Sequence, residues 1–183
     1  MLPSSAASTA ATTEAAGEGS GAYTGTPIKI GGIGPITGAA AVYGQAVKNA
    51  EELAVKEINA AGGILGATVK LSTKDDQGTP AEAVSGFNSL LSEGAAAIIG
   101  ATLSSCTSAI TSLADDEGIV LVTPSSTADS ITTTDDYVFR SCFKDSFQGE
   151  MVAAYAKDQG WTKAAVLYAT GDTYSSGLHD SFV

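Results

Sequence analysis

The sequence has few of the residues on which metal centres and disulfide frameworks depend. It has one histidine, His179, and two cysteines, Cys106 and Cys142, so a transition-metal site lacks ligands. The cysteines leave two readings open, one disulfide outside the cell or two buried thiols inside it. No run approaches the roughly 18 consecutive apolar residues that a membrane-spanning helix needs. The sequence therefore indicates neither a metal, nor a cofactor, nor a membrane span.

Basic residues are also scarce. Nine Lys and Arg stand against 20 Asp and Glu, which gives a formal net charge of −11. Such a surface repels phosphate backbones and anionic membranes, so we expect no nucleic-acid partner. Hydrophobic residues make up 44% of the 183 residues and the mean hydropathy is +0.15. The chain can therefore bury a real core, in one domain or in one domain plus part of another.

The first 26 residues differ in composition from the rest. They are mostly Ser, Ala, Thr, Gly and Glu, and they show no apolar period. Such a segment cannot bury enough surface to offset its ordering entropy, so we expect a flexible tether over 1–26. It has no charged region followed by an apolar region, as a signal peptide would. A tether at this place often follows an export signal or a lipid anchor, which suggests an exported protein.

From Pro27 onward, short apolar runs alternate with amphipathic segments. The apolar runs predict strands over 28–33, 67–73, 95–100, 119–124 and 137–141. The segments between them predict helices over roughly 42–60, from Pro80, and over 104–118. The first helix would bury one stripe, namely Ala46, Ala50, Leu53, Ala54 and Ile58. This alternation predicts an α/β fold with a doubly wound parallel sheet. A further helix over 146–159 and a strand over 164–169 should follow.

Two enzyme readings have weak support. Gly32, Gly34 and Gly38 follow the first strand with a spacing close to a dinucleotide-binding fingerprint, but the acids at the end of the second strand lie too far along the chain to bind the ribose. The alternative is a plain tight turn. No Ser lies in a G-x-S-x-G elbow, and His179 has no second base beside it. We therefore expect that the protein is not an enzyme.

Hydroxyl side chains gather where two strands are expected to end. Ser104 and Ser105 lie where a strand enters a helix, which suits a small anion such as a carboxylate. Ser125, Ser126 and Thr127 follow the next strand. Helix capping alone would explain Ser104 or Ser105. Because ligands of such sheets bind at the carboxyl ends of the strands, two clusters there favour a binding site.

A series of motifs runs over about 28–177, namely IKIGGIGPITGAAAVYGQ, INAAGGILG, DDQGTP, IIG followed by SS, DEGIVLVTPSSTA and FRSCFKDSFQG. In this order and spacing they resemble the leucine/isoleucine/valine-binding protein family, the receptors of ABC importers with the type I periplasmic-binding fold. The resemblance implies an extracytoplasmic receptor that delivers a branched-chain or related amino acid to a membrane permease. It also implies two α/β lobes that close on the ligand.

The resemblance implies roles for particular residues. Ser104 would hold the α-carboxylate, and Ser125 and Thr127 would bind the carboxylate and the ammonium. Asp145 and Tyr174 match positions that close the pocket from the second lobe, and Tyr43 matches an aromatic of the pocket wall. The remaining hydroxyl candidates of the two clusters are Ser105 and Ser126.

The sequence also departs from the family. DDQGTP lacks the cysteine of the disulfide that the resembled receptor carries, and family members are considerably longer. We therefore expect an incomplete first lobe over 27–143 and a truncated start of the second lobe over 144–183. The acidic group expected to pair with the ammonium would be absent. Three alternatives stay open: the same fold binding an amide, urea or aromatic acid, a ligand-sensing regulatory domain, and, more distantly, a nucleotide-dependent enzyme.

Overall fold

The computed structural model describes residues 25–133 and 137–183, so the predicted tether lies almost entirely outside the described residues. Five parallel strands form one sheet in the order β2-β1-β3-β4-β5. Their bounds are β1 (Ile28–Gly34), β2 (Val69–Asp75), β3 (Ala97–Ile99), β4 (Val120–Thr123) and β5 (Val138–Arg140). The strand order reverses at β1, as in a doubly wound sheet. The predicted fold class is confirmed.

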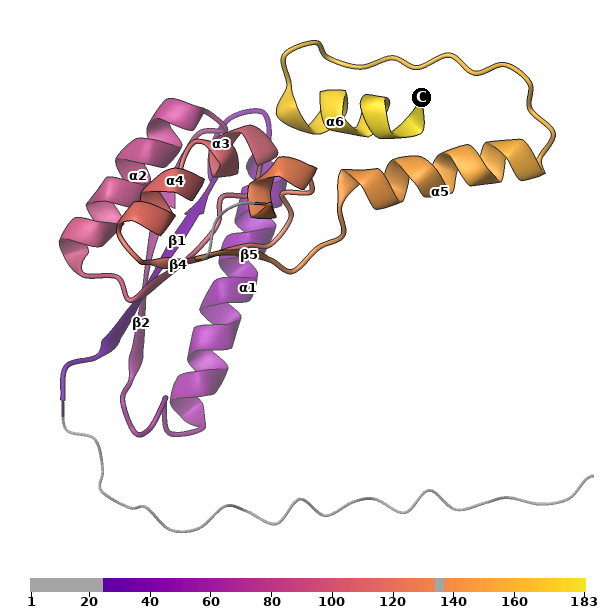
Figure 1. Ribbon diagram of the computed structural model, residues 1–183. Helices are drawn as coiled ribbons and strands as arrows, with labels where there is room; N and C mark the ends of the chain where they lie inside the picture. The colour runs from indigo at the N-terminus through magenta and orange to yellow at the C-terminus, as the bar shows by residue number, and fades with distance from the viewer. Residues whose placement is uncertain (1–24, 134–136) are drawn as a thin grey trace, which may run out of the picture.

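Helices cover the two faces of the sheet unequally. One face carries α2 (Pro80–Glu93), α3 (Ser104–Ser108) and α4 (Thr111–Asp116), and the other carries α1 (Ala41–Ala60), as Figure 1 shows. The core lies on the three-helix side, where Phe87, Ile98 and Leu121 are fully buried. In α2, Thr79 caps the first turn by accepting a bond from the Glu82 amide, and Pro80 occupies the first helical position.

The predicted inner face of α1 is wrong. Leu53 and Ile58 are 55% and 38% exposed, and the predicted alanines are exposed as well. The buried residues of α1 are instead Gly44 and Glu51. The helix lies over glycines of β1, and a Cβ at Gly32 would meet the Glu51 carboxylate. No second helix of the described chain packs beside α1 on that face, so its apolar stripe stays uncovered.

The predicted third helix is interrupted. It forms α3 and α4, and the residue before α3 is Leu103, so neither Ser104 nor Ser105 caps it. The Thr107 hydroxyl lies within bonding distance of the Leu103 carbonyl, and the Ile110 amide donates to the Thr107 carbonyl, three residues back. This tighter turn ends α3 after five residues. A 3₁₀-helix, η1 (Asp129–Thr132), follows β4.

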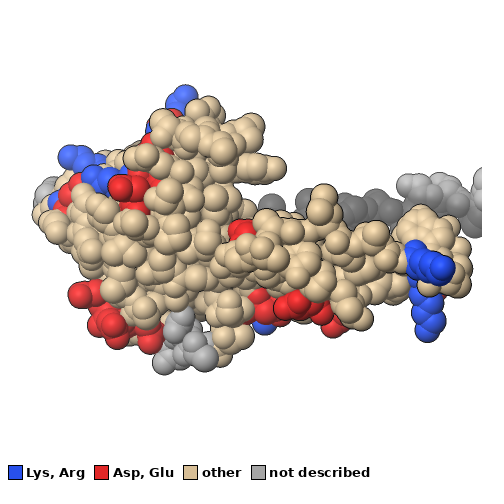
Figure 2. Space-filling model, turned by 90° about the horizontal axis from the view of Figure 1, so that it is seen from above, with Lys and Arg blue, Asp and Glu red and all other residues tan. Residues whose placement is uncertain are grey.

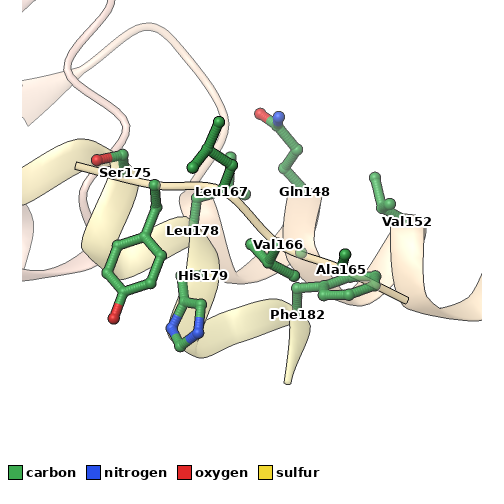
Figure 3. A pocket seen from close by; sticks show the side chains of 11 residues that line it. Gln148, Val152, Ala165, Val166, Leu167, Ser175, Leu178, His179 and Phe182 are labelled. Carbon is green, nitrogen blue, oxygen red and sulfur yellow. The ribbon is translucent and has the colours of Figure 1, made fainter. Parts of the chain in front are cut away.

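Beyond the sheet, α5 (Asp145–Asp158) and α6 (Thr173–Phe182) pack on each other and are joined by a long connection (Figure 1). The strand predicted over 164–169 is absent from this connection, because no strand of the described chain lies beside it. Leu167 is fully exposed. Val166, Leu178 and Phe182 surround an open apolar hollow of about 320 Å³ between the connection and the two helices (Figure 3).

On the face seen in Figure 2, the acidic side chains are not gathered in one place. In the view of Figure 2, Asp and Glu form several separate groups, with broad uncharged areas between them. Such a distribution suits a solvated shell better than a single acidic binding face.

Candidate functional site

A cavity of about 340 Å³ opens at the carboxyl ends of β3 and β4, between the start of α1 and the pair α5 and α6. It is lined by Tyr43, Thr102, Leu103, Ser104, Ser125, Thr127, Phe143, Gln148, Asp172 and Tyr174. Five of the eight residues proposed from the sequence are in this set. The structure therefore brings together Ser104, Ser125 and Thr127 from the two hydroxyl clusters, with Tyr43 and Tyr174 around them.

A buried network fixes the two hydroxyl loops to each other. The hydroxyl oxygens of Thr107, Thr123 and Ser126 lie 2.9, 2.7 and 3.1 Å from the carbonyl oxygen of Ala101. All three side chains are fully buried. Because this network joins the loop after β3 to the loop after β4, the positions of Ser104 and Thr127 are set before any ligand arrives.

Arg140, on β5, holds the loop that follows β4. Its guanidinium donates to the carbonyls of Ser126, Ala128 and Asp129 and to the Thr132 hydroxyl, at 2.8–3.3 Å. The planar, five-donor group suits such a fork of acceptors. The loop that presents Thr127 is thus clamped between β5 and η1.

The hydroxyls in the cavity have complementary capacities. Ser104 Oγ accepts from the Ala128 amide at 3.4 Å, so its own proton is free to be donated to an anion. Ser125 Oγ donates to the Thr102 carbonyl at 2.7 Å, so its oxygen is free to accept from a cation. Thr127 is 8% exposed and also lines the cavity. The arrangement suits a small molecule with both an acidic and a basic group.

Three candidates from the sequence do not line the cavity. Ser105 is half-buried on α3, and Ser126 is fully buried with its hydroxyl directed at the Ala101 carbonyl. Asp145, the first residue of α5, is 1% exposed, and its amide donates to the Thr127 carbonyl. Burial raises the pKa of its carboxyl group, and the Thr127 hydroxyl opposes that rise. Neither carboxylate oxygen has a partner of full hydrogen-bond geometry.

Five lining residues were missed from the sequence. Thr102 and Leu103 directly follow the β3 strand end, so the rule that located Ser104 could have found them. Asp172 caps α6 by accepting from the Ser175 amide at 2.8 Å, and the Asp-x-x-Ser spacing signals that cap. Phe143 and Gln148 carry no local signal, because they reach the cavity through the packing of α5.

The glycine loop after β1 does not offer a phosphate cradle. The amides of Ile36 and Thr37 donate to the Asp75 carboxylate at 2.8 and 3.2 Å. A dinucleotide phosphate would need such amides free, and it would meet a carboxylate there. The geometry supports the plain turn over the nucleotide reading.

Other chemistry finds little support in the described chain. Over 25–133 and 137–183, no three His, Cys, Asp or Glu side chains converge as metal ligands would. Cys106 is buried, Cys142 is half-buried, and both are free thiols. None of the helices in these ranges has the length and apolar content to cross a membrane.

Comparison with known proteins matches residues 27–183 to the sequence profile described as periplasmic binding protein. The Leu/Ile/Val-binding protein BraC3 of Rhizobium johnstonii is 36% identical over 156 residues, 85% of this chain and 42% of the relative. A Pseudomonas aeruginosa protein named for binding leucine, isoleucine, valine, threonine and alanine is 32% identical over 152 residues, 82% of this chain and 41% of the relative.

Among solved structures, the branched-chain amino acid transporter substrate-binding protein LivJ of Streptococcus pneumoniae, in complex with isoleucine, has a TM-score of 0.80. It is 37% identical and the match covers 86% of this chain and 46% of LivJ. The chain thus spans less than half the length of these relatives. The resemblance noted from the motifs is confirmed, and this chain belongs to the periplasmic binding protein family, with Leu/Ile/Val-binding proteins among its relatives.

Proposed function

We propose that this chain forms the ligand-binding part of an extracytoplasmic solute-binding receptor. The receptor delivers a branched-chain or related amino acid to the membrane permease of an ABC importer, and it catalyses no reaction. The observation that carries the proposal is the cavity at the ends of β3 and β4, where Ser104, Ser125 and Thr127 converge. The relatives named for leucine, isoleucine and valine support the ligand class.

The cavity would hold a zwitterion in a defined orientation. The free proton of Ser104 would donate to the α-carboxylate, and the oxygens of Ser125 and Thr127 would accept from the ammonium. Asp172 in the lining, and Asp145 just beneath it, add negative potential that favours the ammonium. The apolar parts of Tyr43, Phe143 and Leu103 would then face the side chain of the amino acid.

We also propose the division of the chain that the sequence predicted. Residues 27–143 would be the first lobe, incomplete, and 144–183 the start of the second, while 1–26 would tether the receptor to the cell surface. Two features support incomplete lobes: the bare apolar stripe of α1 and the unpaired connection over 164–169. In a two-lobe receptor, closure around the ligand excludes water and supplies much of the affinity.

The test is a titration of the isotopically labelled 183-residue chain with leucine, isoleucine and valine, followed by NMR. We expect dissociation constants in the range of about a millimolar, with the resonances of Ser104 and Thr127 among those that move. Ser104→Ala should weaken binding by about three- to tenfold, because it removes a charge-assisted bond. Ser108→Ala, an exposed serine on the same helix and outside the cavity, is the matched control.

Two outcomes would count against the proposal. If none of the three amino acids moves these resonances, the cavity is not an amino-acid site, and urea, an amide and an aromatic acid in the same titration identify the alternative ligand class. Micromolar binding by the 183-residue chain alone would contradict the view that a second lobe must complete the pocket.

A further inference from the structure

The helix α5 begins without a cap from its own segment. The residue before its first turn is Lys144, which has an extended backbone and whose side chain makes no capping bond. The first amides of a helix have no partner within the helix, so they need acceptors from elsewhere. In this chain the acceptors for the start of α5 come from the loop after β4 and from η1.

Asp129, the first residue of η1, supplies the cap. Its Oδ1 accepts from the Ser146 amide at 2.9 Å, and its Oδ2 accepts from the Ser146 hydroxyl at 2.7 Å. Burial acts to raise the pKa of the Asp129 carboxyl group, but the bonds from Ser146 and the positive charges nearby outweigh it and lower the pKa. The acceptor is therefore a charged carboxylate, which the dipole of a helix favours at its N-terminus.

The capping residue is itself fixed to the loop that carries Thr127. The Arg140 guanidinium donates to the carbonyl of Asp129 at 3.3 Å. The amide of Asp145, next to the capped residue, donates to the Thr127 carbonyl at 2.9 Å. Two walls of the cavity are thus joined, namely the loop after β4 and the helix α5, which contributes Gln148 to the lining.

Resting on the function proposed above, we infer that Asp129 is a positioning residue for ligand binding. It holds α5 against the loop after β4, so that a ligand on Ser104 and Thr127 also meets Gln148. Because the ligand then bridges two walls, ligand binding and the capped first turn of α5 stabilise each other by the same factor. Without the carboxylate, the helix loses its cap and the wall loses its place.

The experiment measures leucine affinity and hydrogen exchange by NMR in the 183-residue chain and its variants. Asp129→Ala should weaken binding by about three- to tenfold. In the ligand-free chain it should speed exchange of the first-turn amides of α5 by about tenfold. Saturating leucine should slow this exchange in the original chain and leave it unchanged in Asp129→Ala. Asp158→Ala, which removes an exposed carboxylate at the far end of α5, should alter neither quantity.

A second variant separates positioning from helix stability. Lys144→Ser places a good capping residue directly before α5, so in the Asp129→Ala background it should restore slow exchange in the ligand-free helix. Leucine affinity should nevertheless stay weak, because a local cap does not attach α5 to the loop after β4. Affinity that returns in the double variant, or that is unchanged in Asp129→Ala, would overturn this inference and leave the proposed function standing. Binding of none of leucine, isoleucine and valine by the original chain would overturn both.

Discussion

Glu51 gives the fold a pH dependence that can be measured. It lies on α1 with 6% of its surface exposed, and neither carboxylate oxygen has a hydrogen-bond partner. A Cβ on Gly32 would come within 2.5 Å of its Oε2, so the side chain occupies space that the glycine leaves. Burial, reinforced by the neighbouring charge of Glu52 and opposed by Lys48, raises the pKa of Glu51 from 4.5 to about 7.

The direction of the effect follows from this pKa. Because the folded chain holds the proton more tightly than the unfolded chain, the contribution of Glu51 to stability is complete below pH 4.5 and is lost as the pH rises through 7. The difference between the two pKa values corresponds to at most about 3 kcal/mol. The open sheet face beside α1 admits some water, so a loss of about 2 kcal/mol is the working expectation.

Urea unfolding followed by circular dichroism between pH 5 and pH 8 tests this. The free energy of unfolding of Glu51→Gln should exceed that of the original chain by less than about 1 kcal/mol at pH 5 and by about 2 kcal/mol at pH 8. Other groups with raised pKa values, such as Asp76, titrate in both proteins and cancel in the difference. Glu57→Gln, an exposed position on the same helix, is the control. A gap between Glu51→Gln and the original chain that does not change with pH would refute the reasoning.

Three further changes test other parts of the structure. Arg140→Lys should lower the free energy of unfolding by about 2–3 kcal/mol, because an ammonium cannot reach all the acceptors of the fork, and urea unfolding would show it. Asp145→Asn should raise the melting temperature at pH 8 and lose this advantage as the pH falls towards 4, because burial raises the pKa of the carboxyl group; an equal shift at both pH values would contradict that cause. The fully exposed Leu167 lies in an unpaired apolar segment, so the chain should associate as its concentration rises, and Leu167→Lys should reduce this in sedimentation velocity; a chain that stays monomeric would show that the segment is not adhesive.

The sheet could be predicted from the sequence because its strands are short apolar runs that alternate with helical segments, although the structure covers the two faces of the sheet unequally. The run predicted over 119–124, for example, contains β4 at Val120–Thr123. The run over 164–169 has the same appearance but no neighbouring strand, so sequence pattern alone could not distinguish a strand that pairs from one that does not.

The orientation of α1 could not be predicted for a related reason. Its apolar stripe indicates which residues would favour burial, but the helix lies over Gly32 and Gly34, whose lack of side chains admits a close approach by Gly44 and Glu51. The cavity was predictable where strand ends supply it, as at Ser104 and Thr127. It was not predictable where later helices supply it, as at Gln148.

The positions of the binding groups and the affinity for a ligand depend on different parts of the molecule. Bonds at the edge of the sheet set the positions, whereas the affinity depends on covering the side that is left open. The groups that position Ser104 and Thr127 are mainly the hydroxyl network on Ala101 and the guanidinium of Arg140, which are bonded among the sheet and the loops at its edge. From α5 comes the amide of Asp145, which donates to the Thr127 carbonyl. The half of the cavity on the sheet is therefore preorganised, so a ligand meets donors and acceptors that are already in place. The open side leaves those groups in contact with water, where charge-assisted bonds are weak. Weak binding by the 183-residue chain would then reflect missing closure, and Ser104→Ala should change affinity by a similar factor in this chain and in a longer protein that supplies the second lobe.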